Sequence, residues 1–249
     1  MSRPLVVVCT PTYNRRFALN FSAECYKRQT YPNLHWIILD NSTDEEKSWA
    51  PIQERKDIPH TYIHIEGKKP IGYLRNVCLE EALKLNPTYI AFWDDDDFYV
   101  KHRIQAGVEA LEKDSTKDII GCEVLPVFLS KENVLMETGP YGQNHSTAAT
   151  YLFRASIATN RRFIPDAEKA EEGSFTRDWT LPMCMLPAKD VILVIGHQFN
   201  TVNKSQMLAN PAKFAARITN DANAKNIVRF QWIKDPVLWD LFCKTFLLA

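Results

Sequence analysis

The chain has 249 residues, and its 30 Lys and Arg balance its 30 Asp and Glu. Hydrophobic residues make up 45% of the sequence, enough for a sizeable core without disulfides. The balanced charge argues against a nucleic-acid partner, which needs a clustered basic surface. No apolar run approaches the ~20 residues that span a bilayer, so we expect no transmembrane segment. The six cysteines lack paired spacing, and we expect them to be reduced in a cytoplasmic protein.

Buried strands and helices alternate over the first 97 residues. Apolar and β-branched runs predict strands at 5–10, 34–39, 61–65 and 89–93. Apolar residues at helical spacing predict helices at 14–29 and 72–85. This alternation is typical of a mostly parallel α/β sheet with right-handed crossovers.

The pattern changes after residue 98. A further helix is predicted at 102–113, and strands are predicted at 119–129, 148–153 and 191–195. The segment 167–185 reads as partly helical. A last helix is expected to begin at Asp235-Pro236, with Asp as the N-cap and Pro in the first turn.

Polar clusters follow three of the predicted strands, at 10–15, 40–44 and 94–97. Ligands of such sheets bind beyond the carboxyl ends of the strands. The three clusters are therefore expected to meet at one edge and to form a binding site.

The third cluster consists of four consecutive aspartates, 94–97, after the apolar strand. Four adjacent carboxylates repel one another unless a cation lies among them. Carboxylate oxygens suit Mg²⁺ and Mn²⁺, which often bind substrate phosphates as well. The run therefore predicts a metal-diphosphate site rather than a solvated acidic turn.

Four segments together resemble family 2 of the GT-A glycosyltransferases. FWDDDD at 92–97 resembles the D-x-D region, and PTYNR at 11–15 resembles the P-x-Y-N-R opening. QTYPN at 29–33 with IILDNSTD at 37–44 resembles the second strand and its base-binding loop. GYLRN at 72–76 resembles the G-x-x-x-A-R-N helix start, although Leu replaces the usual Ala.

The resemblance implies a GT-A-type, Rossmann-like fold, with a mixed, mostly parallel sheet flanked by helices in a single domain over 1–249. Residues 1–105 would bind the nucleotide-sugar, 106–210 would bind the acceptor, and 211–249 would form a C-terminal helical segment. The implied reaction transfers a sugar from a nucleotide-diphosphate-sugar to a hydroxyl of a carbohydrate or glycan, with inversion and with Mn²⁺ or Mg²⁺. A UDP-sugar is preferred, with GDP- or dTDP-sugars next, and a homo-oligomer remains open.

Matching motif to motif implies roles for the donor-binding side chains. The residues that would line the nucleoside pocket are Thr10, Pro11, Tyr13 and Arg15. Asp40 would accept a hydrogen bond from the base, and Arg75 would approach the diphosphate.

The same matching assigns the aspartates. Asp94 and Asp95 would contact the ribose or the donor sugar, and Asp96 is the preferred metal ligand. Asp94 and His197 are further candidates for the metal. Four aspartates permit two registers of D-x-D, and both stay open.

An inverting transfer needs a general base for the acceptor hydroxyl. The family's base belongs to an E-D-x-x-L-like segment, which RDWTL at 177–181 resembles, with Arg in place of the acid. Asp178 is therefore preferred as the base, and Glu171 and Glu172 are its rivals.

Two other functions compete with this interpretation. A sugar-phosphate nucleotidyltransferase has a similar sheet and metal carboxylates, but the first strand lacks the glycine-rich signature expected of it. A non-catalytic nucleotide-sugar-binding module would keep the aspartates and tolerate loss of the base.

Overall fold

The computed structural model of the protein describes residues 3–43, 52, 55–200, 203–220 and 222–248. Its larger sheet has seven strands in the order β10-β6-β9-β4-β1-β2-β3. In chain order these strands are β1 (Val6–Thr12), β2 (Leu34–Asp40), β3 (His60–His64), β4 (Tyr89–Phe92), β6 (Ile119–Gly121), β9 (Leu152–Arg154) and β10 (Met183–Met185). Strands β4, β1, β2 and β3 are mutually parallel, while β9 runs antiparallel to β4 and β6.

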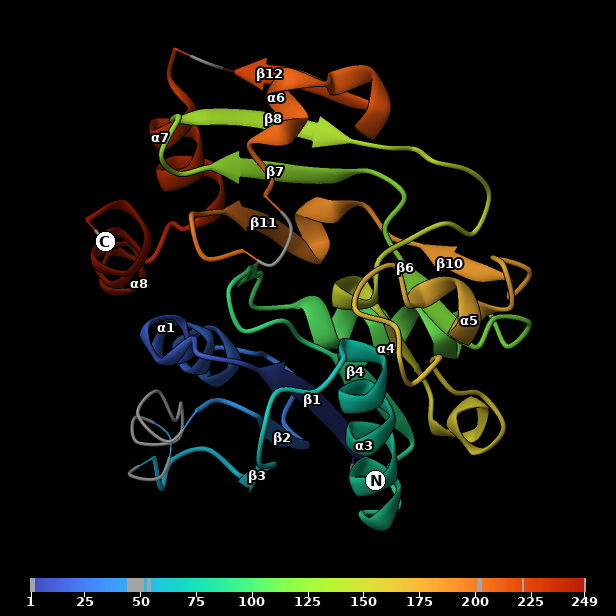
Figure 1. Ribbon diagram of the computed structural model, residues 1–249. Coiled ribbons are helices and arrows are strands. Elements are labelled where there is room, and N and C mark those ends of the chain that lie inside the picture. Colours follow the sequence, from blue (N-terminus) through green and yellow to red (C-terminus); the bar gives the residue numbers. More distant parts are fainter. Residues whose placement is uncertain (1–2, 44–51, 53–54, 201–202, 221, 249) are drawn as a thin grey trace.

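A second sheet of five strands has the order β12-β8-β7-β11-β5. Its strands are β5 (Phe98–Tyr99), β7 (Leu125–Leu129), β8 (Val134–Thr138), β11 (Ile192–Gly196) and β12 (Ala216–Asn220). Figure 1 shows β7, β8 and β12 at the top of the molecule, across from the parallel strands β1, β2 and β3.

Helices surround these sheets. The α-helices are α1 (Arg16–Lys27), α3 (Ile71–Lys84), α4 (Arg103–Lys113), α5 (Glu172–Thr176), α6 (Gln206–Ala209), α7 (Ala224–Ile227) and α8 (Pro236–Phe242). Short 3₁₀ turns are η2 (Ala148–Thr150), η3 (Ala155–Thr159), η4 (Ala188–Asp190) and η5 (Pro211–Phe214). Two π-helical turns, η6 (Val228–Trp232) and η7 (Cys243–Leu247), follow α7 and α8.

Strand β1 lies at the centre of the parallel strands, and both of its faces are buried. Val6 and Val8 belong to the core that includes α1, whereas Val7 and Cys9 belong to the core that includes α3. Side chains alternate along a strand, so a continuous apolar run supplies both faces. Each buried valine stabilises the fold by roughly 1.5–3 kcal/mol relative to exposure. This packing fixes the carboxyl edge on which the polar clusters lie.

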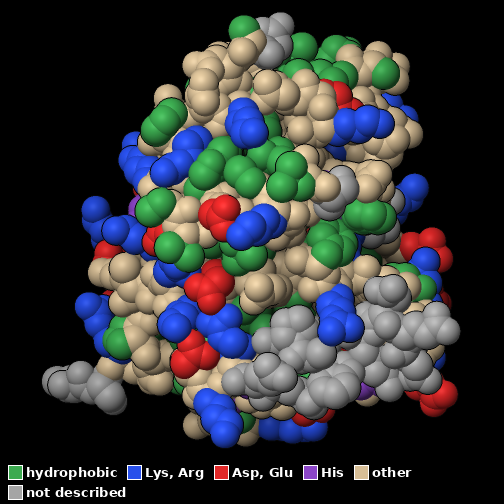
Figure 2. Space-filling model, turned by 90° about the vertical axis from the view of Figure 1, so that its left-hand side faces the viewer, with side chains coloured by type: hydrophobic (Ala, Val, Ile, Leu, Met, Phe, Trp, Pro, Cys, Tyr) green, Lys and Arg blue, Asp and Glu red, His purple; other side chains and the backbone are tan. Residues whose placement is uncertain are grey.

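The C-terminal tail packs on α1. Phe242 and Phe246 are buried, and their rings lie 5.8 and 5.3 Å from that of Phe21. Asp235 caps α8 as expected, accepting hydrogen bonds from the backbone N–H groups of Val237 and Leu238. On this side of the molecule, hydrophobic side chains gather among Lys and Arg (Figure 2). Of the helices in the described ranges, none is both long and apolar enough to cross a membrane.

The α/β architecture expected from the sequence is confirmed, and the main differences lie after residue 97. The strand expected at 119–129 is two strands, β6 and β7, which belong to different sheets. The first residues of the strand expected at 148–153 form η2, and only the end of that segment pairs as β9. Strands β5, β8, β10 and β12 were not expected, and β10 lies in the segment that was expected to be partly helical.

Candidate functional site

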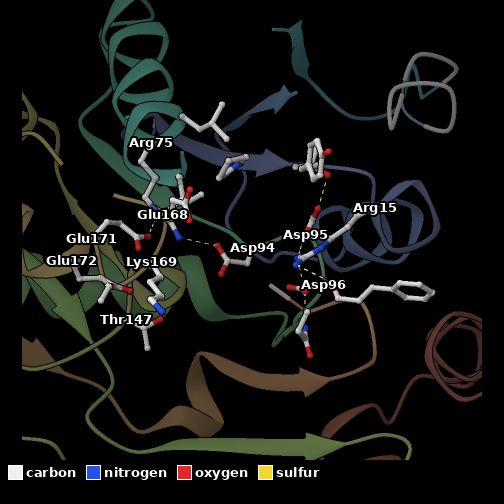
Figure 3. Close-up of a pocket in the computed structure, with 18 of the residues that line it drawn as sticks. Arg15, Arg75, Asp94, Asp95, Asp96, Thr147, Glu168, Lys169, Glu171 and Glu172 are labelled. Atoms are coloured by element: carbon white, nitrogen blue, oxygen red, sulfur yellow. Dashed lines mark hydrogen bonds and ion pairs between the residues drawn. The ribbon is translucent and has the colours of Figure 1, made fainter. Parts of the chain in front are cut away.

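A cavity of about 580 Å³ opens at the carboxyl edge of the parallel strands. Figure 3 shows two groups of charged side chains across it, one around Arg15 and one around Arg75, with Asp94 between them. The residues that line it are Pro11, Thr12, Tyr13, Arg15, Lys68, Ile71, Leu74, Arg75, Asp94, Asp95, Asp96, Thr147, Glu168, Lys169, Ala170, Glu171, Glu172, Phe199, Asn200 and Lys204. The expectation that the β1 and β4 clusters meet at one edge is therefore met.

The loop after β1 is tied directly to the aspartates after β4. Arg15 Nη1 lies 2.9 Å from Asp95 Oδ1 and 2.5 Å from Asp96 Oδ2. Thr12 Oγ1 donates a hydrogen bond of 2.5 Å to Asp95 Oδ2. Arg15 thus supplies positive charge inside a group of carboxylates that would otherwise repel one another.

The end of β11 reaches the same aspartates from the other side. His197 Nε2 lies 3.1 Å from Asp96 Oδ2, and Asn200 Nδ2 donates to the same oxygen at 3.0 Å. Asp97 Oδ1 accepts a hydrogen bond of 2.9 Å from the N–H of Ile195. Asp97 therefore joins the aspartate run to β11 and holds His197 beside Asp96.

The pKa values of the buried aspartates are shifted in different directions. Burial raises the pKa of Asp95 to about 6, although Arg15 opposes the rise. Burial also raises the pKa of Asp97 to about 8, against the charge of Lys204. At Asp96 burial acts in the same direction, but Arg15 and His197 outweigh it and hold the pKa well below its ordinary value. Asp96 is thus the aspartate most firmly held as a carboxylate.

Arg75 organises the opposite side of the cavity. Its Nε donates to Glu171 Oε1 at 2.7 Å, and its Nη2 lies 3.4 Å from Asp94 Oδ1. The guanidinium also lies over the ring of Phe92, 4.8 Å from the centroid. Arg75 and Glu171 are both buried. The motif match predicts that Arg75 approaches a diphosphate. The structure shows Arg75 paired with two carboxylates, those of Glu171 and Asp94.

Glu172 begins α5 and lines two cavities. Its Oε1 accepts a hydrogen bond of 3.1 Å from the N–H of Ala148. Burial, and then the neighbouring charge of Glu171, raise the pKa of Glu172 to about 7. A second cavity of about 220 Å³ adjoins the first and shares Thr147, Ala170 and Glu172 with it. The Glu172 carboxyl therefore lies where the two cavities meet.

Asp178, the preferred base from the sequence, does not lie where the two cavities meet. It is exposed and does not line either cavity. Helix α5 ends at Thr176, and Asp178 follows in a left-handed backbone conformation with φ of 51°. Of the three carboxylates weighed for the base, the structure brings Glu171 and Glu172 to the cavity.

Thr10 and Asp40 are also absent from the cavity lining, unlike Pro11 and Tyr13. Both are fully buried. Thr10 Oγ1 accepts a hydrogen bond from Trp36 Nε1 at 2.8 Å. Asp40 accepts hydrogen bonds from the Ser42 N–H and the Tyr62 hydroxyl. These two side chains support the strand ends rather than face the cavity, and residue 44 of the same cluster lies outside the described residues.

Within the described ranges, no group of three or more His, Cys, Asp or Glu is arranged to hold a metal ion. Asp94 and Asp96 line the cavity, and the His197 imidazole, which is not among the lining residues, lies 3.1 Å from Asp96. Mg²⁺ and Mn²⁺ sites that act on diphosphates commonly use one or two carboxylates, with water and phosphate oxygens as the remaining ligands. The residues present fit such a shared site and do not fit a metal site made of protein alone.

The sequence did not point to several lining residues. Lys68 Nζ lies over the Tyr13 ring, 5.3 Å from its centroid, and Lys204 Nζ donates to the carbonyl of Ile195 at 3.1 Å. Thr147, Lys169 and Asn200 also line the cavity. These residues come from loops far apart in the chain, and no short motif marks them.

Residues 7–146 match the sequence model of the family described as "Glycosyl transferase family 2". The chain belongs to this family. The match includes the strand ends, the Arg15 loop and the aspartate run. The predicted resemblance is thereby confirmed.

Two named relatives of this family 2 chain come from bacteria. A Bacillus subtilis (strain 168) protein, provisionally named the teichuronic acid biosynthesis glycosyltransferase TuaG, is 31% identical over 108 residues. That match covers 43% of this chain and 42% of the relative. The Escherichia coli protein WfaP, named a UDP-Glc:α-D-GlcNAc-diphosphoundecaprenol β-1,3-glucosyltransferase, is 29% identical over 133 residues. That match covers 53% of this chain and 47% of WfaP, so the matched segments span less than half of each relative.

Solved structures of low identity share the fold. The mannosyltransferase PcManGT from Pyrobaculum calidifontis, in complex with GDP-Man and Mn²⁺, aligns with a TM-score of 0.63 and 14% identity. The alignment covers 96% of this chain and 73% of PcManGT. Staphylococcus aureus TarS 1–349 in complex with UDP-GlcNAc aligns with a TM-score of 0.59 and 16% identity, covering 97% of this chain and 81% of that one. The family 2 chain therefore has the GT-A fold.

Proposed function

We propose that this family 2 chain transfers a sugar from a nucleotide-diphosphate-sugar to a hydroxyl acceptor, with a divalent metal and with inversion at the anomeric carbon. UDP is the preferred nucleotide. The position of Glu172 carries the proposal, because this carboxyl lies where a large charged cavity meets a smaller one. Such a carboxyl would lie within reach of both a donor and an acceptor.

The large cavity suits a nucleotide-sugar. Pro11, Tyr13 and Leu74 give one part of it an apolar lining, to which a base and ribose could pack. Lys68, beside Tyr13, and Lys204, near Asp96, bring positive charge to the lining. An elongated ligand with an apolar end and a diphosphate matches this distribution of groups.

Asp96 would hold the metal, with His197 as a second ligand and Asp94 nearby. The metal, when bound, would neutralise charge on the departing diphosphate. Arg15, which pairs with Asp95 and Asp96, would bring positive charge to the diphosphate side of the site. Asp97 would keep the His197 loop in place through its bond to Ile195.

Glu172 would act as the general base. A pKa of about 7 is close to the optimum for taking a proton near neutral pH. Glu171 pairs with Arg75 and would act as a positioning residue, because its charge contributes to the raised pKa of Glu172. The base and the metal would then lie on opposite sides of the reacting sugar.

The direct test is the release of nucleotide diphosphate from UDP-sugars and GDP-mannose, with Mn²⁺ and then with EDTA. We expect release that requires metal and that falls in Glu172→Gln but not in Asp178→Asn. Release that is unchanged by EDTA would refute the metal, and a loss confined to Asp178→Asn would return the base to that residue.

A further inference from the structure

We propose that the smaller cavity is an acceptor subsite that packs an uncharged sugar ring against the aromatic stack of Trp179, His145 and Tyr141. The inference rests on the proposed function, since it names the class of acceptor whose hydroxyl would reach Glu172. The cavity of about 220 Å³ is lined by these three rings together with Cys122, Glu123, Leu125, Ser146, Thr147, Ala170 and Glu172.

The three rings form one aromatic stack, in which His145 contacts both Trp179 and Tyr141. The His145 and Trp179 rings are stacked, with centroids 3.8 Å apart and planes 16° from parallel. The Tyr141 ring follows at 5.1 Å from His145, inclined by 35°. Tyr141 keeps 45% of its surface exposed, and its hydroxyl donates to the carbonyl of Phe214 at 2.6 Å. The stack is thus held in place while one of its rings still faces solvent.

The backbone around Trp179 is strained. Arg177, Asp178 and Trp179 are consecutive non-glycine residues in the left-handed region, with φ of 53°, 51° and 63°. Each such residue costs roughly 1–2 kcal/mol, and a bulky aromatic there is a real outlier. Asn144 ties this turn to the neighbouring loop by donating to the Trp179 carbonyl at 3.4 Å and accepting from the Met183 N–H at 3.0 Å. Strain of this kind is retained where a side chain must be held in one position.

The charge of the lining selects an uncharged occupant. The described residues of this cavity include two carboxylates, Glu123 and Glu172, and no Lys or Arg. Burial lowers the pKa of His145 below its ordinary value, so its ring is neutral at pH 7. A phosphate or carboxylate placed here would meet negative charge without a cation.

A pyranose ring fits these features. Its C–H face is apolar and can pack on an aromatic surface, while its rim of hydroxyls needs acceptors and donors. A hydroxyl of such a ring could approach Glu172, which lies in the lining of both cavities. The occupant is therefore the terminal sugar of an acceptor glycan, with its neutral ring on Trp179 and its nucleophilic hydroxyl toward the donor.

Saturation-transfer NMR with methyl glycosides tests this subsite. The probes are methyl glycosides of glucose, galactose, mannose and N-acetylglucosamine, with glucose 6-phosphate as the charged comparison. The protein is the full chain with UDP and Mn²⁺. The variants are Trp179→Ala, Trp179→Phe and Tyr141→Ala, and the control is Phe230→Ala, a 68% exposed aromatic outside both cavities.

We expect at least one neutral glycoside to bind the wild-type protein and to bind Trp179→Ala about tenfold more weakly. Trp179→Phe should recover most of the affinity, Tyr141→Ala should weaken it, and Phe230→Ala should match the wild type. UDP affinity should stay the same in all four variants, because none of these side chains lines the large cavity.

Equal glycoside binding by Trp179→Ala and the wild type would overturn the subsite. So would tighter binding of glucose 6-phosphate than of the neutral glycosides, or no glycoside binding by a wild-type protein that holds UDP. A wild-type protein that fails to bind UDP would refute the donor function instead, and this separates the two proposals.

Discussion

Replacing Glu172 by Gln should remove activity and raise stability at the same time. The substitution keeps the shape of the side chain and the oxygen that accepts from the Ala148 N–H, but it removes the carboxylate. Transfer should fall by roughly 10²–10⁴-fold, the usual contribution of a general base. Binding of UDP with Mn²⁺ should persist, because the charges around Asp96 are untouched.

The gain in stability follows from the raised pKa. The unfolded chain releases the Glu172 proton near its ordinary pKa of 4.5, whereas the folded chain holds it up to about pH 7. Between these values the unfolded state binds fewer protons, so this group lowers the free energy of unfolding as pH rises. Each pH unit of difference is worth about 1.4 kcal/mol. Glu172→Gln should therefore be more stable than the wild type by roughly 2–3 kcal/mol at pH 8, with allowance for its partial exposure.

Urea unfolding at pH 4.5 and pH 8 measures this difference. The two proteins should unfold at similar urea concentrations at pH 4.5, and the variant should be the more stable at pH 8. Asp178→Asn is the matched control, since Asp178 is exposed and outside both cavities, and it should resemble the wild type in activity and stability. A Glu172→Gln protein that keeps full transfer, or that is less stable than the wild type at pH 8, would refute the reasoning.

Asp96→Asn should lower the affinity for UDP far more in Mn²⁺ than in EDTA, as measured by titration calorimetry in both buffers. An equal loss of affinity in the two buffers would show that Asp96 holds no metal. Glu171→Gln removes the partner of the buried Arg75 and should lower the free energy of unfolding by about 3 kcal/mol; an unchanged urea midpoint would show that Asp94 alone satisfies Arg75. The transfer rate at saturating donor should rise through about pH 7 and level off above it, as the proton leaves Glu172, and a rate that falls over this interval would exclude Glu172 as the base. In Glu171→Gln the midpoint of that profile should move to lower pH, because the charge of Glu171 raises the pKa of Glu172.

The sequence predicted the part of the fold that depends on local patterns. The strand at 5–10 and the aspartates at 94–97 were predicted to share an edge, and Arg15 now lies within 2.9 Å of Asp95. Continuous apolar and β-branched runs identified these strands, and parallel pairing determined that their ends meet. The second sheet was not predicted, since β8 and β12 contain partly exposed residues and β12 pairs with a strand that is distant in the sequence.

Asp178, the preferred base from the sequence, lies outside both cavities, and local sequence pattern alone did not predict this position. The residues 177–181 resemble the family motif in letters, yet helix α5 begins five residues earlier, at Glu172. A left-handed turn after Thr176 then leaves Asp178 exposed. The position of this turn depends on contacts with the loop of Asn144 and His145, which the linear sequence does not reveal.

Thr10 and Asp40 do not line the cavity, for a related reason. Both stand at predicted strand ends, but their position in the strand does not say which neighbouring side chains they contact. The Thr10 hydroxyl accepts from the Trp36 indole, and Asp40 accepts from Tyr62. A motif gives the strand end, and the packing of neighbouring strands decides which side chain faces the cavity.

The stereochemistry of slow donor hydrolysis tests the central claim most directly. Proton NMR can follow the anomeric signals while the protein, Mn²⁺ and UDP-α-glucose, UDP-α-GlcNAc or GDP-α-mannose are incubated without acceptor, with Glu172→Gln as the control. The proposed mechanism predicts that the β-sugar appears first from at least one donor, only with metal, and far more slowly in Glu172→Gln. Release of the α-sugar first, or hydrolysis of none of these donors in Mn²⁺, would contradict an inverting, metal-dependent transferase with Glu172 as its base.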